Sequence, residues 1–94
     1  TSLQMDIIQG RVFRVIDGDT FDIDVTNIGK KNKFNYHAEE RIRFSSIDAP
    51  EINSRQGQLD KLSLEELLLD KIVEISIEAR DTYNRIVGEV KLVL

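Results

Sequence analysis

The spacing of apolar and polar positions in the first quarter of the chain has the short period of β-strands. Residues 7–16 are rich in β-branched side chains, and Gly10 among them offers a place for a bulge or bend. Residues 21–25 alternate strictly, which predicts apolar side chains facing a core and the carboxylates of Asp22 and Asp24 facing water. Two strands are therefore expected here.

A turn and a third strand follow from the next residues. The Asp-Gly-Asp run at residues 17–19 is a tight-turn signature, so the first two strands should form a hairpin. Residues 26–38 are polar and are interpreted as a long connection. Residues 41–47 return to strand character, with Arg41 and Arg43 on the face opposite the apolar side chains.

The second half of the chain predicts a helix and two more strands. Residues 53–57 are interpreted as a loop, and residues from about 59 to 69 have leucines at helical spacing. Alternation resumes at residues 71–78, and after a turn it predicts a fifth strand at residues 86–94. The chain is thus expected to be mainly β, in the order β-β-β-α-β-β. That order is typical of the five-stranded oligonucleotide-binding-type barrel, one option among several small α+β folds.

Composition narrows the class of protein. The chain has 94 residues, 40% hydrophobic and 32% charged, which describes one small globular domain. No apolar run is long enough to span a bilayer. The absence of cysteine excludes disulfides and thiolate chemistry, and the only histidine, His37, is interpreted as a solvated loop residue. A net charge of −4 argues against a broadly basic nucleic-acid-binding surface, but it is compatible with a small site.

Five positions together suggest phosphodiester hydrolysis. Asp19 and Asp48 offer carboxylates at strand ends, which suit a hard cation that prefers oxygen ligands. Glu51 is a third carboxylate, which could activate a water. Arg43 and Arg85 supply permanently charged planar donors for phosphate oxygens. Taken singly, each position also fits an ordinary role in a hairpin turn, at a strand end or on a solvated strand face.

Three sequence blocks resemble the signature blocks of the staphylococcal nuclease family. They are VIDGDTFDI at residues 15–23, RIRFSSIDAPE at residues 41–51 and DTYNRIVGEV at residues 81–90. The blocks occur in the family's order, with a leucine-rich helical segment between the second and third. A lone DGDT would be a weak signal, whereas the three blocks in order are a specific one.

The resemblance implies a calcium site and a general base. Asp19 and Asp48 match the family's two carboxylate ligands of calcium, and Ala49 matches the residue whose backbone carbonyl completes the protein's share of the shell. Glu51 matches the residue usually assigned as the base that activates the attacking water. The implied cofactor is therefore Ca²⁺.

The resemblance also implies the residues that hold the phosphate. Arg43 and Arg85 match the two arginines that stabilise the pentacoordinate phosphate, and Tyr83 matches a tyrosine beside the phosphate. A packing role for Tyr83 is an alternative. Asn84 stands where the family commonly has glycine, and asparagine tolerates the left-handed dihedrals that such a turn requires.

By resemblance, the chain is expected to be a calcium-dependent endonuclease that hydrolyses the P–O5′ bond of DNA or RNA and leaves 3′-phosphate ends. The alternative is a non-catalytic module of the same fold that binds nucleic acid or a protein. Residues 1–94 are expected to form a single nuclease domain without the C-terminal helices usual in the family. Residues 87–94 would then expose an apolar face that favours self-association. Family members are often secreted, which is the resemblance's only indication of a compartment.

Overall fold

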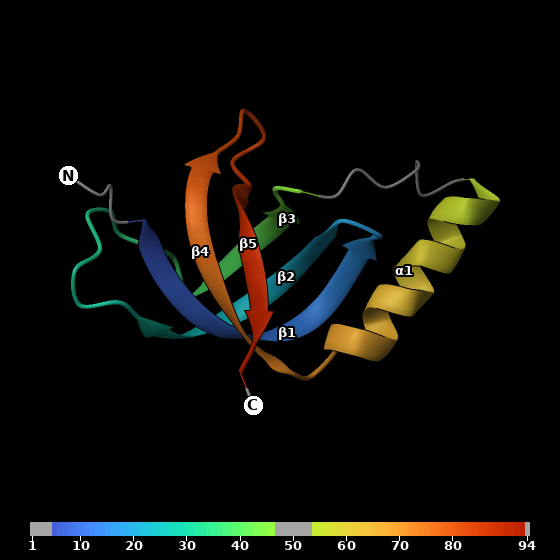
Figure 1. Cartoon of the computed structure of the whole chain (residues 1–94), viewed down its shortest axis with the longest axis horizontal. Coiled ribbons are helices and arrows are strands. Elements are labelled where there is room, and N and C mark those ends of the chain that lie inside the picture. Colours follow the sequence, from blue (N-terminus) through green and yellow to red (C-terminus); the bar gives the residue numbers. More distant parts are fainter. Residues whose placement is uncertain (1–4, 47–53, 94) are drawn as a thin grey trace.

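The protein is described by a computed structural model over residues 5–46 and 54–93. Within these residues it has five strands and one helix, in the order β-β-β-α-β-β expected from the sequence (Figure 1). The elements are β1 (Asp6–Asp17), β2 (Thr20–Ile28), β3 (Glu39–Phe44), α1 (Arg55–Leu68), β4 (Ile72–Arg80) and β5 (Ile86–Leu92).

The strands close into a barrel. Their order around it is β1-β2-β3-β5-β4, and β4 pairs with β1 to complete the ring. All neighbours are antiparallel except β3 and β5, which are parallel. A closed five-stranded barrel with one helix between its third and fourth strands is the oligonucleotide-binding-type architecture, so the predicted fold class is confirmed.

Alternation along the strands fills the barrel with apolar side chains. Phe21 is fully buried and packs against Phe44 with the ring centroids 5.5 Å apart. The other core residues come from every strand and from the helix, and they are Ile8, Val12, Val15, Ile23, Ile42, Leu64, Leu68, Val73, Ile75 and Ile86. Because inward positions carry these side chains, the alternate positions of each strand point to the outer face of the barrel.

The prediction that Asp22 faces water is wrong. Asp22 does lie on the outer face of β2, but it is only 5% exposed, because Arg14 and Arg41 on the neighbouring strands bind its carboxylate and cover it. Asp24 is half-buried and binds Arg11. Alternation predicted the face of each aspartate correctly, but the cover over Asp22 comes from other strands.

The predicted bulge at Gly10 is confirmed. The pairing of β1 with β2 shifts register between Gln9 and Gly10. A Cβ atom at Gly10 would lie 2.6 Å from the backbone oxygen of Asp24, an approach that real Cβ atoms do not make. Glycine therefore allows β2 to approach closely as the sheet curves.

The helix begins one turn earlier than the leucine spacing predicted. Residues 53–57 were expected to be a loop, but Ser54 caps the helix, and its Oγ accepts a hydrogen bond of 2.9 Å from the backbone N–H of Gly57. A serine cap satisfies one of the orphan N–H groups of the first turn, which is why a polar, glycine-containing turn can still be helical. The helix therefore extends over Arg55–Leu68.

The last turn of α1 fixes the helix to β1. Leu64 and Leu68 are buried in the core, whereas Leu67 is 62% exposed. Beyond the helix, Asp70 adopts a left-handed φ of 64°, and its backbone N–H donates to the carbonyl of Val12 at 2.8 Å. These contacts tie the helix to the outside of the barrel beside the β1–β2 hairpin (Figure 1).

Strand ends differ from the sequence-based bounds. β2 extends to Ile28, into the predicted connection, because Ile28 pairs with Ile8 of β1. β4 likewise extends to Arg80. β5 ends at Leu92, which with Val93 is 40% exposed. Self-association through this apolar end stays a prediction.

Candidate active site

The β1–β2 hairpin places Asp19 beside Arg43. Asp19 is 7% exposed, and its Oδ1 accepts a hydrogen bond of 2.8 Å from the hydroxyl of Thr20. The backbone oxygen of Asp19 accepts from the N–H of Phe44 at 3.0 Å, which fastens the turn to β3. Nη2 of Arg43 lies 3.7 Å from Oδ2 of Asp19. The structure thus brings together the predicted metal ligand and one predicted phosphate-binding arginine.

Negative charge is concentrated at this turn. Oδ1 of Asp17 accepts a hydrogen bond from the backbone N–H of Asp19 at 3.1 Å. Burial, together with the neighbouring carboxylate of Asp19, raises the pKa of Asp17 above its ordinary value. The neighbouring carboxylates of Asp17 and Asp19 form an environment that a cation would stabilise.

A second turn positions Arg85. The carboxylate of Asp81 accepts hydrogen bonds from the backbone N–H groups of Tyr83 (3.0 Å) and Arg85 (2.8 Å). It also accepts from Nε of Arg85 at 2.7 Å. Burial works to raise the pKa of Asp81, but the hydrogen bonds from Arg85 outweigh it and lower that pKa. Asn84 has a φ of 65°, so the expectation that asparagine adopts the left-handed conformation here is confirmed.

Tyr83 has no role in the core. It is 80% exposed, so it does not pack in the core of residues 5–46 and 54–93. The guanidinium of Arg85 lies over its ring, 5.2 Å from the centroid, at a cation–π distance. Tyr83 therefore stands at the surface next to Arg85, where a ligand could reach both.

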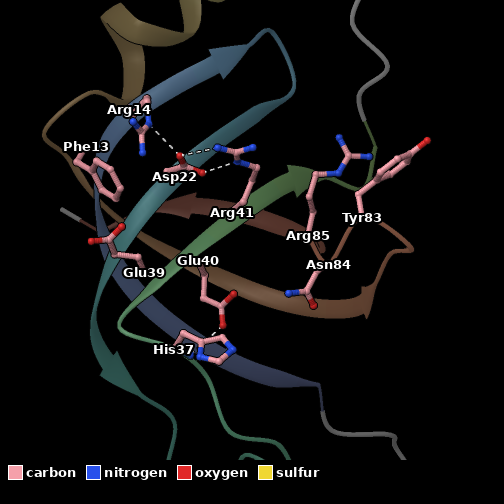
Figure 2. A pocket seen from close by; sticks show the side chains of 10 residues that line it. All are labelled: Phe13, Arg14, Asp22, His37, Glu39, Glu40, Arg41, Tyr83, Asn84 and Arg85. Carbon is pink, nitrogen blue, oxygen red and sulfur yellow. Dashed lines mark hydrogen bonds and ion pairs between the residues drawn. The ribbon is translucent and has the colours of Figure 1, made fainter.

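An open groove of about 560 Å³ begins at these two residues and crosses the outer face of the barrel (Figure 2). Arg14, Asp22 and Arg41 line it together with Arg85 and Tyr83. The remaining lining residues are Phe13, His37, Glu39, Glu40 and Asn84.

The sequence patterns did not predict the part of Arg14, Asp22 and Arg41 in this groove. Each lies at an outward position of its own strand, but they gather only through strand pairing, which no local pattern shows. Aligning the predicted hairpin with the third strand could have identified them. In that alignment Arg14 pairs with Asp22, and Asp22 pairs with Arg41.

Two other groove residues have structural roles. Glu40 is 5% exposed, and its carboxylate binds the guanidinium of Arg80 at 3.1 Å. His37 is exposed, as predicted, and its backbone N–H donates to Oε2 of Glu40 at 2.9 Å. Neither arrangement resembles a metal site.

Three predicted site residues, Asp48, Ala49 and Glu51, lie outside the described residues. Within residues 5–46 and 54–93, no three His, Cys, Asp or Glu side chains come together in a group that could hold a metal. Asp19 offers buried, oxygen-only donor chemistry, which fits a hard cation but is an incomplete ligand set by itself. In the same two ranges, no helix has the length and apolar character needed to cross a membrane.

No protein-family model matches the chain. It is similar to a protein named uncharacterized endonuclease from Escherichia coli, with 35% identity over 83 residues, covering 88% of this chain and 48% of that protein. A second uncharacterized endonuclease, from Haemophilus influenzae, is 35% identical over 75 residues, which are 80% of this chain and 37% of that protein.

A protein named micrococcal nuclease, from Shigella flexneri, is 30% identical over 82 residues, which are 87% of this chain and 41% of that protein. The chain therefore spans half or less of the length of these curated relatives. The identity nevertheless runs over most of this chain, which has a closed barrel and carries the three sequence blocks in the expected order along its sequence. The similarity to proteins named endonuclease and micrococcal nuclease over most of this chain therefore supports a staphylococcal nuclease-like domain.

Proposed function

We propose that residues 1–94 form a single nuclease domain that hydrolyses the P–O5′ bond of DNA or RNA in the presence of calcium. In this reaction water attacks phosphorus, the P–O5′ bond breaks, and the products carry a 3′-phosphate and a 5′-hydroxyl. One observation carries the proposal: the carboxylate of Asp19 is buried at the hairpin tip with the guanidinium of Arg43 at 3.7 Å. The residue proposed to bind the cation is thus next to one proposed to bind the phosphate.

The donor chemistry supports calcium. Asp19, Asp48 and the carbonyl of Ala49 would hold Ca²⁺, since hard cations prefer carboxylate and carbonyl oxygens. The bound ion would supply positive charge to the phosphate oxygens. Asp17 places a second carboxylate at the same turn, and its Oδ1 accepts a hydrogen bond from the backbone N–H of Asp19. Thr20 holds one oxygen of Asp19 through a hydrogen bond of 2.8 Å and so orients the carboxylate.

The arginines would act on the phosphate. Arg43 and Arg85 are proposed to bind the phosphate oxygens, on which negative charge increases as the pentacoordinate state forms. Asp81 orients Arg85 by accepting from its Nε, so the guanidinium is positioned before substrate arrives. Tyr83 is proposed to contact the same phosphate, and Glu51 to accept the proton of the attacking water.

The test is digestion of single-stranded DNA and of RNA by the purified protein, with calcium and with a chelator. We expect cleavage only with calcium and products that carry 3′-phosphate, identified by end-group labelling. Glu51→Gln protein, prepared identically, controls for contaminating nucleases and should be about 10²–10⁴-fold slower. Cleavage that persists in chelator, or 5′-phosphate ends, would contradict the proposal. Calcium-independent binding without cleavage would instead identify a binding module.

A further inference from the structure

Three charged side chains form a row across the outer face of the barrel. Arg14 of β1 pairs in register with Asp22 of β2, and Asp22 pairs with Arg41 of β3. Neighbouring strands lie about 4.8 Å apart, so the three side chains stand side by side. Nε of Arg14 donates to Oδ2 of Asp22 at 3.0 Å, and Arg41 donates from Nε at 2.8 Å and from Nη2 at 3.1 Å (Figure 2).

The row carries a surplus positive charge. The side chain of Asp22 is only 7% exposed, whereas those of Arg14 and Arg41 are 58% and 48% exposed. Burial works to raise the pKa of Asp22, but the hydrogen bonds from Arg41 and Arg14 outweigh it, so the carboxylate stays ionised at neutral pH. One buried carboxylate therefore orients two exposed guanidinium groups.

The arginines keep donors for a ligand. A guanidinium has five N–H groups, and within residues 5–46 and 54–93 the hydrogen bonds of Arg14 use only Nε. Arg14 also lies over the ring of Phe13, 5.1 Å from its centroid, which limits the directions it can take. A fixed arginine with unused donors is suited to a phosphate.

The row continues into the candidate active site. Ile42 of β3 pairs with Ile86 of β5, and both are fully buried. Arg41 of β3 and Arg85, which lies just before β5, immediately precede this pair, and both line the groove in Figure 2. Arg43 lies two residues after Arg41 on the same face of β3, at a distance of about 6.6 Å along the strand.

The rest of the groove limits where a phosphate can lie. Glu39 and Glu40 line it together with His37, and Glu40 is bound to Arg80. Phosphate is disfavoured beside these carboxylates and favoured on the side formed by Arg14, Arg41 and Arg85.

We propose that Arg14 and Arg41, oriented by Asp22, bind a second phosphate of the strand whose scissile phosphate lies at Arg43 and Arg85. The inference rests on the proposed function and names its substrate class as a polynucleotide. A phosphate outside the reacting one adds binding energy only when the substrate has a neighbouring nucleotide. Short esters with one phosphodiester should therefore be poorer substrates than oligonucleotides.

Binding tests the inference independently of cleavage. The affinity of a labelled single-stranded oligonucleotide is measured by fluorescence anisotropy in chelator, over a range of salt concentrations. Arg14→Gln should weaken binding by roughly tenfold, because the variant no longer makes an ionic hydrogen bond to phosphate. The slope of log affinity against log salt should fall by about 0.7 for each phosphate that the variant no longer neutralises. Arg41→Gln should have the same effects.

Arg11→Gln is the matched control. Arg11 is also on β1 and also binds an aspartate of β2, but it is not among the residues that line the groove. It should leave affinity and salt slope unchanged. Arg14→Gln keeps the two hydrogen bonds between Arg41 and Asp22, so it should fold even if Arg41→Gln does not.

The outcomes separate this inference from the proposed function. Calcium-dependent cleavage together with wild-type affinity and salt slope in folded Arg14→Gln protein would overturn the inference alone. Reduced affinity and slope in that variant would support it even if no cleavage is found. Failure of the wild-type protein to bind the oligonucleotide would overturn it. Where cleavage occurs, Arg14→Gln should lower kcat/KM more for the oligonucleotide than for a dinucleotide.

Discussion

The carboxylate of Asp81 holds Arg85 from two sides, because Oδ2 accepts from Nε at 2.7 Å and Oδ1 accepts from the backbone N–H at 2.8 Å. The same carboxylate closes the turn through Tyr83, so the direction of the Arg85 side chain is coupled to the shape of the turn. Asp81 therefore positions Arg85, the arginine that we propose binds the phosphate.

Asp81→Asn should lower kcat on the order of 10-fold or more by misplacing Arg85. Arg85→Ala removes the guanidinium itself and should cost on the order of 10²-fold in kcat, with a smaller change in ground-state binding. Steady-state kinetics on single-stranded DNA measure both effects. Asp70→Asn is the control, since Asp70 binds the guanidinium of Arg11 and carries no proposed role in the reaction. A loss confined to KM would make Arg85 a simple binding residue.

Asp22 should stabilise the fold in a pH-dependent way. Because its pKa in the folded protein is lowered from the ordinary 3.8, its contribution is present above pH 3.8 and is lost as the pH falls through the folded-state value. Asp22→Asn should reduce the free energy of unfolding by about 1–3 kcal/mol at neutral pH. The lower part of this range is favoured because both arginines are about half exposed to water.

Chemical denaturation of wild-type and Asp22→Asn protein between neutral pH and about pH 2 measures this contribution. The difference in unfolding free energy should be constant above about pH 5 and should close below 3.8. Asp24→Asn, which removes a half-exposed ion pair with Arg11, should cost only about 0–1 kcal/mol. A difference for Asp22→Asn that persists unchanged at low pH would show that charge is not its origin.

The face that α1 turns to the barrel can be tested with two adjacent leucines. Leu68 is 6% exposed, and Leu68→Ala should reduce the free energy of unfolding by about 2–5 kcal/mol because a cavity is left. Leu67 is 62% exposed, and Leu67→Ala should change it by about 0.5 kcal/mol or less. Thermal or denaturant melts decide, and equal losses for the two would contradict the packing of the helix.

Much of the fold follows from local sequence patterns. Strict alternation at Phe21 and Ile23 predicted the inner face of β2, and the Asp-Gly-Asp turn predicted the hairpin. The predicted start of the helix was too late, because the apolar spacing begins only at Leu59. The helix in fact starts after Ser54, whose Oγ accepts a hydrogen bond from the backbone N–H of Gly57. Periodicity reports which side chains are buried, and a cap leaves no periodic signal.

Residues in sequence motifs could be predicted as site residues, whereas residues that meet only through strand pairing could not. Motif spacing predicted that Asp19 and Arg43 belong to one site, and in the structure the carboxylate and the guanidinium lie 3.7 Å apart. It did not identify the role of Asp22, whose partners Arg14 and Arg41 are 8 and 19 positions away. Asp81 looked like an ordinary turn residue, because an aspartate that organises a turn and one that orients an arginine have the same local sequence.

The calcium dependence of cleavage by Asp19→Asn protein tests whether Asp19 binds the metal that cleavage is proposed to need. Initial rates on single-stranded DNA are measured against calcium concentration for wild type, Asp19→Asn and, as a control on the same strand pair, Asp24→Asn. If Asp19 binds the metal, Asp19→Asn should require much more calcium, with part of the lost rate restored at high calcium, while Asp24→Asn should follow wild type. An Asp19→Asn protein with the wild-type rate and calcium dependence would contradict the assignment of this carboxylate to the metal.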